Sequence, residues 1–298
     1  MQLLHEKTKE RTNHSTQSMK IAITGATGML GQALTKTFSK HSLTPLSSRD
    51  LDVTSLEKVR RVVADLKPDW IIHAAAYTRV DAAESDSFEA YRVNALGTRN
   101  LALAARESDS GLAYYSTDYV FDGAQQRPYR EWDPANPLSV YGASKLAGEF
   151  FLRPLCPRHL IVRTSWLFGA GGSHFVGKII AAALEKELLE VVNDQRGSPT
   201  FTTDLAYMTL CLVEAEKSGT YHVTNSGNCS WDEFAREIIS LSDLKSEVRP
   251  IPSTDLAAPA RRPHNSVLEN YLLQLEGMPL LRTWQSALAA FLGKLARE

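Results

Sequence analysis

The chain has 298 residues, of which 43% are hydrophobic and 22% are charged, as expected for a globular enzyme with one or two domains. The formal net charge is −1 and no basic block stands out, which argues against a nucleic-acid partner. The apolar runs are far too short to span a bilayer, so we expect no membrane association. The three scattered cysteines lack metal-ligand spacing and suit a reducing compartment, which predicts a cytoplasmic protein.

The first 18 residues differ from the rest of the chain. They are polar and lack the apolar stretch of a signal peptide. We interpret residues 1–18 as a disordered extension, with the fold beginning at Met19.

A short apolar segment, 20–24, predicts a strand that runs into a glycine-rich loop and then a helix to about Lys40. This context makes the loop a candidate dinucleotide site. Gly25 permits the tight turn, Gly28 lets the backbone approach phosphate, and Gly31 allows close helix packing. A strand-turn-helix that uses the same glycines without a ligand is the alternative.

Short apolar strands and helices then alternate along the chain, which predicts right-handed crossovers and a parallel sheet. We therefore expect an α/β fold with a doubly wound, Rossmann-like cofactor domain over 19–168. Thr54 and Glu57 suggest a capping box at the second helix. The further strands are expected at 42–46, 70–74, 112–116 and 159–163, and the helices at 54–66, at 87–106 and around Tyr141.

The pattern loosens beyond Gly169, and 169–298 is expected to be mainly a smaller, substrate-binding lobe. Segments at about 189–223 are expected to return to the cofactor domain. Helices are predicted at 173–189, 204–215 and 230–241, with a strand at 189–192 and a last strand at 220–223.

Tyr141 and Lys145 are the central candidates for chemistry. Their four-residue spacing places both side chains on one helix face. An ammonium near a phenol favours the phenolate, so we expect Lys145 to lower the pKa of Tyr141. Thr117 ends the fourth predicted strand, where its hydroxyl could hold a substrate carbonyl. A lone threonine at the end of a strand is usually a cap or turn residue. Together with the dinucleotide loop, however, Thr117, Tyr141 and Lys145 predict hydride transfer.

The choice of cofactor depends on the end of the second predicted strand. Ser47, Ser48 and Arg49 stand there, and a hydroxyl with a guanidinium suits a 2′-phosphate. The sequence therefore favours NADPH over NADH, with a plain solvated loop as the alternative. Small side chains at 74–76 suit a backbone that passes close to a cofactor, or simply tight helix-sheet packing.

Several motifs together resemble one family. They are the glycine loop at 24–31, Thr117, the Tyr141/Lys145 pair, 116–123 (Ser-Thr-Asp-Tyr-Val-Phe-Asp-Gly), 164–166, 197–200 with 204–206, and 262–266. The chain is similar to the dTDP-4-dehydrorhamnose reductases, which are extended short-chain dehydrogenase/reductases. The resemblance covers nearly everything from Met19 onward.

The resemblance implies reduction of the C4 ketone of a small nucleotide-sugar substrate, dTDP-4-dehydro-L-rhamnose, by NADPH or NADH. It implies that Tyr141 donates the proton, Thr117 holds the carbonyl oxygen, and Lys145 binds the nicotinamide ribose. The implied cofactor contacts are Gly25, Thr27, Gly28, Met29, Leu30, Gly31, Arg49, Asp52, Val53, Ala74, Ala75 and Ala76, besides Tyr141 and Lys145. The implied sugar contacts are Thr78, Val80, Asp118, Tyr119 and Trp166, whose indole we expect to pack on the deoxysugar face, with core or lobe packing as the alternative.

Other members of the superfamily remain as alternatives. Sugar-nucleotide 4,6-dehydratases carry Asp-Glu after the threonine, whereas this chain has Asp118 and Tyr119, which argues against dehydration. Another NDP-sugar reductase or an epimerase stays open. So does a non-catalytic NADP-binding subunit like that of methionine adenosyltransferase, although Trp166 and Arg262 favour the reductase. The family leaves a Mg²⁺ requirement and a homodimer open, and the sequence identifies no metal ligands.

Overall fold

The computed structural model describes residues 18–295, so the disorder expected over 1–18 lies, apart from Ser18, outside the described residues. A six-stranded sheet forms the centre of the molecule, and every neighbouring pair of strands in it is parallel. The strands in spatial order are β10 (Gly219–His222), β5 (His159–Thr164), β4 (Gly111–Thr117), β3 (Trp70–His73), β1 (Lys20–Thr24) and β2 (Ser42–Leu46).

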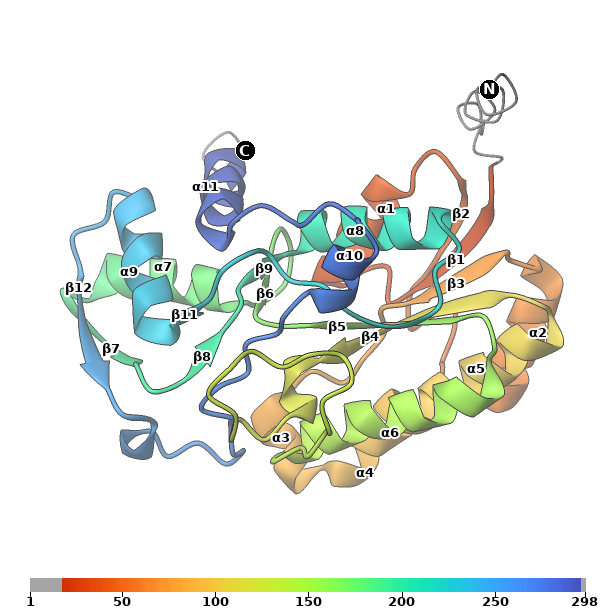
Figure 1. Ribbon diagram of the computed structural model, residues 1–298, viewed down its shortest axis with the longest axis horizontal. Coiled ribbons are helices and arrows are strands. Elements are labelled where there is room, and N and C mark those ends of the chain that lie inside the picture. The colour runs from red at the N-terminus through yellow and green to blue at the C-terminus, as the bar shows by residue number, and fades with distance from the viewer. Residues whose placement is uncertain (1–17, 296–298) are drawn as a thin grey trace, which may run out of the picture.

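Helices cover both faces of this sheet (Figure 1). On one face, α1 (Met29–Thr37) and α8 (Thr202–Glu214) bury Leu34 and Met208 against the strands. On the other face, apolar side chains are contributed by α2 (Leu56–Leu66), α5 (Thr98–Glu107) and α6 (Val140–Leu155). The predicted doubly wound α/β fold is confirmed.

The sheet includes one strand from beyond Gly169. This strand, β10, pairs with β5, from Gly219 opposite Leu160 to His222 opposite Arg163. The division of the chain into a cofactor domain over 19–168 and a lobe over 169–298, with segments at about 189–223 returning to the cofactor domain, stays a prediction.

A second group of elements has its own core, built around Phe168, Phe234 and Phe291. Its helices are α7 (Phe175–Glu185), α9 (Trp231–Leu241) and α11 (Trp284–Leu295). β7 (Leu188–Val192) pairs in parallel with β12 (Glu247–Ile251), and shorter pairs join β8 (Arg196–Gly197) to β11 (Cys229–Ser230) and β6 (Leu167–Phe168) to β9 (Thr200–Phe201). The short helix α10 (Tyr271–Leu275) and 3₁₀ turns at Asp118–Val120 and Ser253–Asp255 complete the described elements.

The predicted cap of α2 is one residue out of place. Ser55 is the N-cap, and its hydroxyl accepts a hydrogen bond from the Lys58 amide. The Thr54 hydroxyl instead donates to Asp52 at 2.7 Å. Glu57 therefore lies one position too early in the helix to close a capping box.

The long helix expected over 87–106 is interrupted. The chain forms α3 (Val80–Ser85), α4 (Ser87–Tyr91), a π-helix at Arg92–Gly97 and then α5. Within the π-helix, the buried Asn94 side chain accepts from the Tyr77 amide at 2.9 Å and donates to the Tyr77 carbonyl and the Ser144 hydroxyl. This wider turn is a π-bulge, in which an added residue turns the polar Asn94 side chain inward. The helical periodicity of the sequence does not reveal such a bulge.

The strand expected to be last is not the last one. β11 and β12 follow β10 in the chain. β12 was missed because its residues are largely exposed and polar and include Pro250, a composition that weakens a strand pattern. No helix within 18–295 is both long and apolar enough to cross a membrane.

Candidate active site and cofactor pocket

A cavity of about 510 Å³ lies where strands β1, β3, β4 and β5 end. The carboxyl edge of a parallel sheet is where doubly wound folds bind ligands. Most of the predicted site residues meet in this cavity. They are Gly28, Met29, Leu30, Gly31, Ala74, Ala76, Thr78, Val80, Thr117, Asp118, Tyr119, Tyr141, Lys145 and Trp166.

The glycine loop is packed too closely to carry side chains at two positions. Gly25 has φ of +69°, and a Cβ there would lie 2.5 Å from the Ala75 nitrogen. A Cβ on Gly31 would lie 2.1 Å from the Gly25 oxygen. No side chain caps the first turn of α1, so its amide groups are open to an anion such as a pyrophosphate. This cradle fits the predicted dinucleotide.

Helix α6 brings Tyr141 and Lys145 to the cavity. It begins after Ser139, whose hydroxyl caps it by accepting from the Gly142 amide. A Cβ on Gly142 would lie 2.1 Å from the Tyr119 oxygen, so the helix packs directly on the segment that follows Thr117. The Thr117 hydroxyl forms a hydrogen bond with the half-buried Tyr141 phenol.

The expected lowering of the Tyr141 pKa by Lys145 is wrong for this arrangement. Burial raises the pKa of Tyr141 to about 12, opposed by the hydrogen bond with Thr117 and assisted by the charge of Asp118. The phenol therefore carries its proton at neutral pH.

Lys145 is itself strongly affected by burial. Its side chain is 3% exposed, and Nζ lies 4.2 Å from the centre of the Tyr114 ring, a cation–π contact. Burial lowers the pKa of Lys145 to about 7, against the opposing charge of Glu149. Sequence spacing does not reveal this burial of Lys145. Because burial favours the neutral amine, Lys145 lowers the pKa of Tyr141 less than the spacing predicts.

Asp118 adds a second buried acid. The Thr117 hydroxyl donates to its Oδ1 at 3.0 Å, while within the described residues Oδ2 has no hydrogen-bond partner. Burial raises the pKa of Asp118 to about 7, opposed by the hydroxyls of Ser266 and Thr117 nearby. Tyr119 packs edge-on against Tyr141 at 6.0 Å between ring centres, and it also lines a second cavity.

Trp166 differs from its expected role. Its indole stacks on Trp231 at 3.3 Å between ring centres, with an angle of 5° between the planes. A Cβ on Gly197 would lie 2.3 Å from Cε2 of the same indole, so backbone also packs on the ring. Trp231 therefore covers one face of Trp166, while Trp166 still lines the cavity, and the packing of its indole on a deoxysugar stays a prediction. Trp231 lines the cavity as well, and the sequence offered no signal for it.

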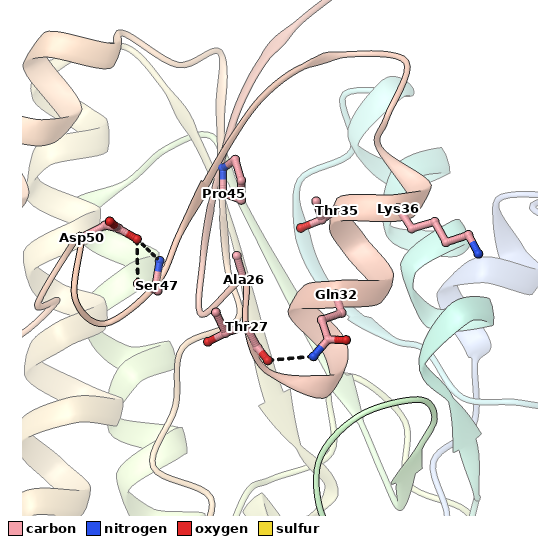
Figure 2. Close-up of a pocket in the computed structure, with 8 residues that line it drawn as sticks. All are labelled: Ala26, Thr27, Gln32, Thr35, Lys36, Pro45, Ser47 and Asp50. Atoms are coloured by element: carbon pink, nitrogen blue, oxygen red, sulfur yellow. Dashed lines mark hydrogen bonds between the residues drawn. The ribbon is translucent and has the colours of Figure 1, made fainter. Parts of the chain in front are cut away.

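A separate pocket of about 560 Å³ lies between the glycine loop and the end of β2 (Figure 2). Thr27, a predicted cofactor contact, lines it together with Ser47 and Asp50. Asp50 accepts hydrogen bonds from the Ser47 amide at 2.8 Å and the Ser47 hydroxyl at 2.6 Å. These bonds lower the pKa of Asp50, so a charged carboxylate stands in this pocket.

Five other predicted cofactor contacts, Gly25 among them, line neither of these two cavities. Arg49 is exposed and does not line the pocket that Asp50 lines. Asp52 accepts from the amide and the hydroxyl of Thr54. Val53 and Ala75 pack in the core beneath the sheet edge.

A further cavity of about 940 Å³ adjoins the first, since Tyr119 and Trp231 line both. Lys178, Arg261 and Arg262 contribute positive charge to it. Arg262 forms a two-pronged ion pair with Asp81 at 2.9 and 2.8 Å. The sequence left Arg262 unassigned because its contact with Asp81 spans most of the chain.

Within residues 18–295, no group of three or more His, Cys, Asp or Glu side chains is arranged to hold a metal ion.

Residues 19–297 match the family model described as the RmlD substrate binding domain. A dTDP-4-dehydrorhamnose reductase of Streptomyces griseus is 42% identical over 275 residues, which cover 89% of this chain and 90% of that protein. A dTDP-4-keto-6-deoxy-D-glucose reductase of Streptomyces niveus is 38% identical, covering 89% of this chain and 94% of that protein.

Among solved structures, this chain is similar to a dTDP-4-dehydrorhamnose reductase from Bacillus anthracis in complex with NADP. The TM-score is 0.91 and the identity 40%, over 93% of this chain and 100% of that chain.

Proposed function

Because the chain belongs to the family of the RmlD substrate binding domain, we propose that it reduces the C4 ketone of dTDP-4-dehydro-L-rhamnose to dTDP-L-rhamnose with NADPH or NADH. The observation that carries the proposal is the meeting of Thr117, Tyr141 and Lys145 with the glycine loop in one cavity. Fold alone would not support it, because related folds serve many reactions.

The reduction needs a hydride on C4 and a proton on the carbonyl oxygen. When bound, the reduced nicotinamide supplies the hydride. Tyr141 donates the proton, because its raised pKa keeps the phenol protonated at neutral pH. The Thr117 hydroxyl, which donates to Asp118 in the structure, turns its proton to the same carbonyl oxygen when the substrate binds. The Lys145 ammonium then stabilises the phenolate until Tyr141 takes a proton from water.

We assign the cofactor to the glycine loop and to the pocket beside β2, and the sugar to the cavity that Thr78, Val80, Asp118, Tyr119 and Trp166 line. In the cavity beyond Tyr119, Asp81 and Glu190 also line the wall, with Arg262 paired to Asp81, and Lys178 and Arg261 are the cations that suit the nucleotide diphosphate. Asp50 opposes a strict preference for NADPH, because a carboxylate accepts from a 2′-hydroxyl and repels a 2′-phosphate. We therefore propose that either cofactor serves.

The test is a spectrophotometric assay of NADPH and NADH oxidation with dTDP-4-dehydro-L-rhamnose generated in place by the preceding enzymes. Loss of reduced cofactor that requires the sugar, together with dTDP-L-rhamnose as product, is the expected result. Cofactor binding without turnover would contradict the proposal and indicate a binding subunit instead.

A second substrate is favoured by one observation, the 38% identity to the relative named dTDP-4-keto-6-deoxy-D-glucose reductase. The same assay with that ketosugar decides between the two. A higher kcat/KM for dTDP-4-keto-6-deoxy-D-glucose would replace the substrate proposed here.

A further inference from the structure

Glu149 is an acid buried close to the proposed catalytic pair. It lies four residues after Lys145 and eight after Tyr141, so the three side chains follow one face of α6. Its exposure is 0%, although a carboxylate that deep in a protein is rare unless it is paired.

Its partners tie it to two strands of the sheet. Arg163 on β5 donates through Nε at 2.9 Å and Nη2 at 2.8 Å, and it is 3% exposed. Ser116 on β4, the neighbour of Thr117, donates its hydroxyl at 2.6 Å. Arg153, one turn further along α6, donates at 2.7 Å. These charge-assisted bonds, with Arg163 as the leading charge, hold the pKa of Glu149 below its ordinary value despite burial.

The other groups around Lys145 are uncharged, so the Glu149 carboxylate matters for the charge of Lys145. Tyr114 of β4 presents its ring to the ammonium, and His73 of β3 lies near enough to be affected by its charge. Burial keeps His73 neutral by lowering its pKa to about 3, and burial keeps the Tyr114 phenol protonated. Among these neighbours, Glu149 is the anionic group, and it is buried one helical turn from Lys145 on α6, where its charge favours the ammonium.

The groups that face Glu149 come from other elements too. Beyond Arg163, Arg153 and Ser116, they include Tyr114 and, on β10, His222, whose pKa burial lowers to about 3. Tyr114 and His222 are both neutral near pH 7. The charged groups around Glu149 are therefore Arg163 and Arg153.

We propose that Glu149 is a positioning residue that keeps Lys145 in its ammonium form beside Tyr141. The proposal rests on the proposed function, in which Lys145 acts as a cation. Without the carboxylate, Lys145 would lie in a desolvated site with the Arg163 guanidinium nearby, and both effects favour the neutral amine. A purely structural Glu149, which only ties α6 to β5, would leave the titration of Lys145 unchanged.

The test follows the titration of Lys145 directly. Acetylation by acetic anhydride is measured over a range of pH in the folded protein, and the modified peptide is quantified by mass spectrometry. In the unchanged protein we expect the reactivity of Lys145 to rise through a midpoint near pH 7. Glu149→Gln should move this midpoint down by about one pH unit or more, the size of a close charge effect.

Two variants serve as controls. Glu149→Asp keeps the charge and should titrate closer to the unchanged protein than Glu149→Gln does. Glu107→Gln removes a glutamate that pairs with Arg60 at 2.7 Å on the surface, and it should leave the midpoint unchanged. A folded Glu149→Gln protein with the original midpoint would overturn the proposal.

A lone buried arginine could prevent Glu149→Gln from folding. The double variant Glu149→Gln/Arg163→Gln removes both charges and is compared with Arg163→Gln, which keeps the carboxylate. The midpoint of the double variant should lie below that of Arg163→Gln, and equal midpoints in the two folded variants would equally overturn the proposal.

Kinetics separate this inference from the proposed function. In the sugar-dependent assay, the alkaline limb of kcat/KM should move to lower pH in Glu149→Gln and stay in place in Glu107→Gln. If the unchanged protein shows no sugar-dependent turnover, the proposed function fails, whereas the acetylation result still decides the role of Glu149.

Discussion

Two aspartates near the ends of strands differ sharply in their surroundings. Asp118 follows β4 and is 2% exposed, with Oδ2 unpartnered within the described residues. Asp50 lies just beyond β2, exposed, and accepts two hydrogen bonds from Ser47. Burial raises the pKa of Asp118 to about 7, while the bonds from Ser47 lower that of Asp50. Desolvation therefore sets the pKa at the proposed catalytic end of the site, and hydrogen bonding sets it at the proposed adenosine end.

The largest expected effect tests the chemistry end. Tyr141→Phe removes the proton donor and keeps the ring, so kcat should fall by about 10²- to 10⁴-fold, the usual worth of a general acid. Cofactor binding, followed by fluorescence, should be nearly unchanged. Tyr207→Phe, on the exposed surface of α8, is the matched control and should retain full turnover. Full turnover in Tyr141→Phe would sink the proposed mechanism.

The next effect concerns the stability of the buried acid. The folded pKa of Asp118 is about 7 and its ordinary value is 3.8, so between these values the folded protein binds a proton that the unfolded chain has released. This group therefore makes the free energy of unfolding fall as pH rises through that window, by up to about 4 kcal/mol.

Asp118→Asn should abolish that loss, because the amide does not titrate and its oxygen still accepts from Thr117. Urea unfolding at several pH values checks this, and parallel pH curves for the variant and the unchanged protein would contradict it. Asp50→Asn tests the opposite case. The lowered pKa of Asp50 stabilises the fold at pH values above the ordinary pKa of an aspartate, and this contribution disappears as the pH falls.

The smallest effect concerns the choice of cofactor. Asp50→Asn removes a carboxylate from the pocket beside β2, so the ratio of kcat/KM for NADPH to that for NADH should rise severalfold. Arg49→Ala is the informative partner, because the exposed Arg49 does not line that pocket and its loss should leave the ratio unchanged. A fall in the ratio on losing Arg49 would restore the preference for NADPH that the sequence indicated.

The sequence predicted what depends on local pattern. The strand before the glycine loop, Thr117 at the end of β4 and the spacing of Tyr141 and Lys145 were all visible, because strand ends and helix faces follow from short-range periodicity. These features located the cavity.

What the sequence did not reveal depends on contacts between distant segments. The Tyr141 pKa depends on burial by several elements, and the Trp166 indole stacks on Trp231 and lies against Gly197. The inward turn of Asn94 requires Tyr77 and Ser144. Such contacts join residues 17 to 65 positions apart, beyond the reach of periodicity.

Tyr119 and Trp231 form a shared wall between two cavities. A change in either aromatic ring alters the boundary of both spaces at once. The free-energy effect of a substitution in either cavity should therefore not add to that of a change in Tyr119 or Trp231. The effects of two substitutions, one in each cavity, should add nearly fully when both rings are intact. A double-mutant cycle would thus measure the contribution of Tyr119 and Trp231 as a coupling energy between the two cavities, which cannot be assigned to either binding site alone.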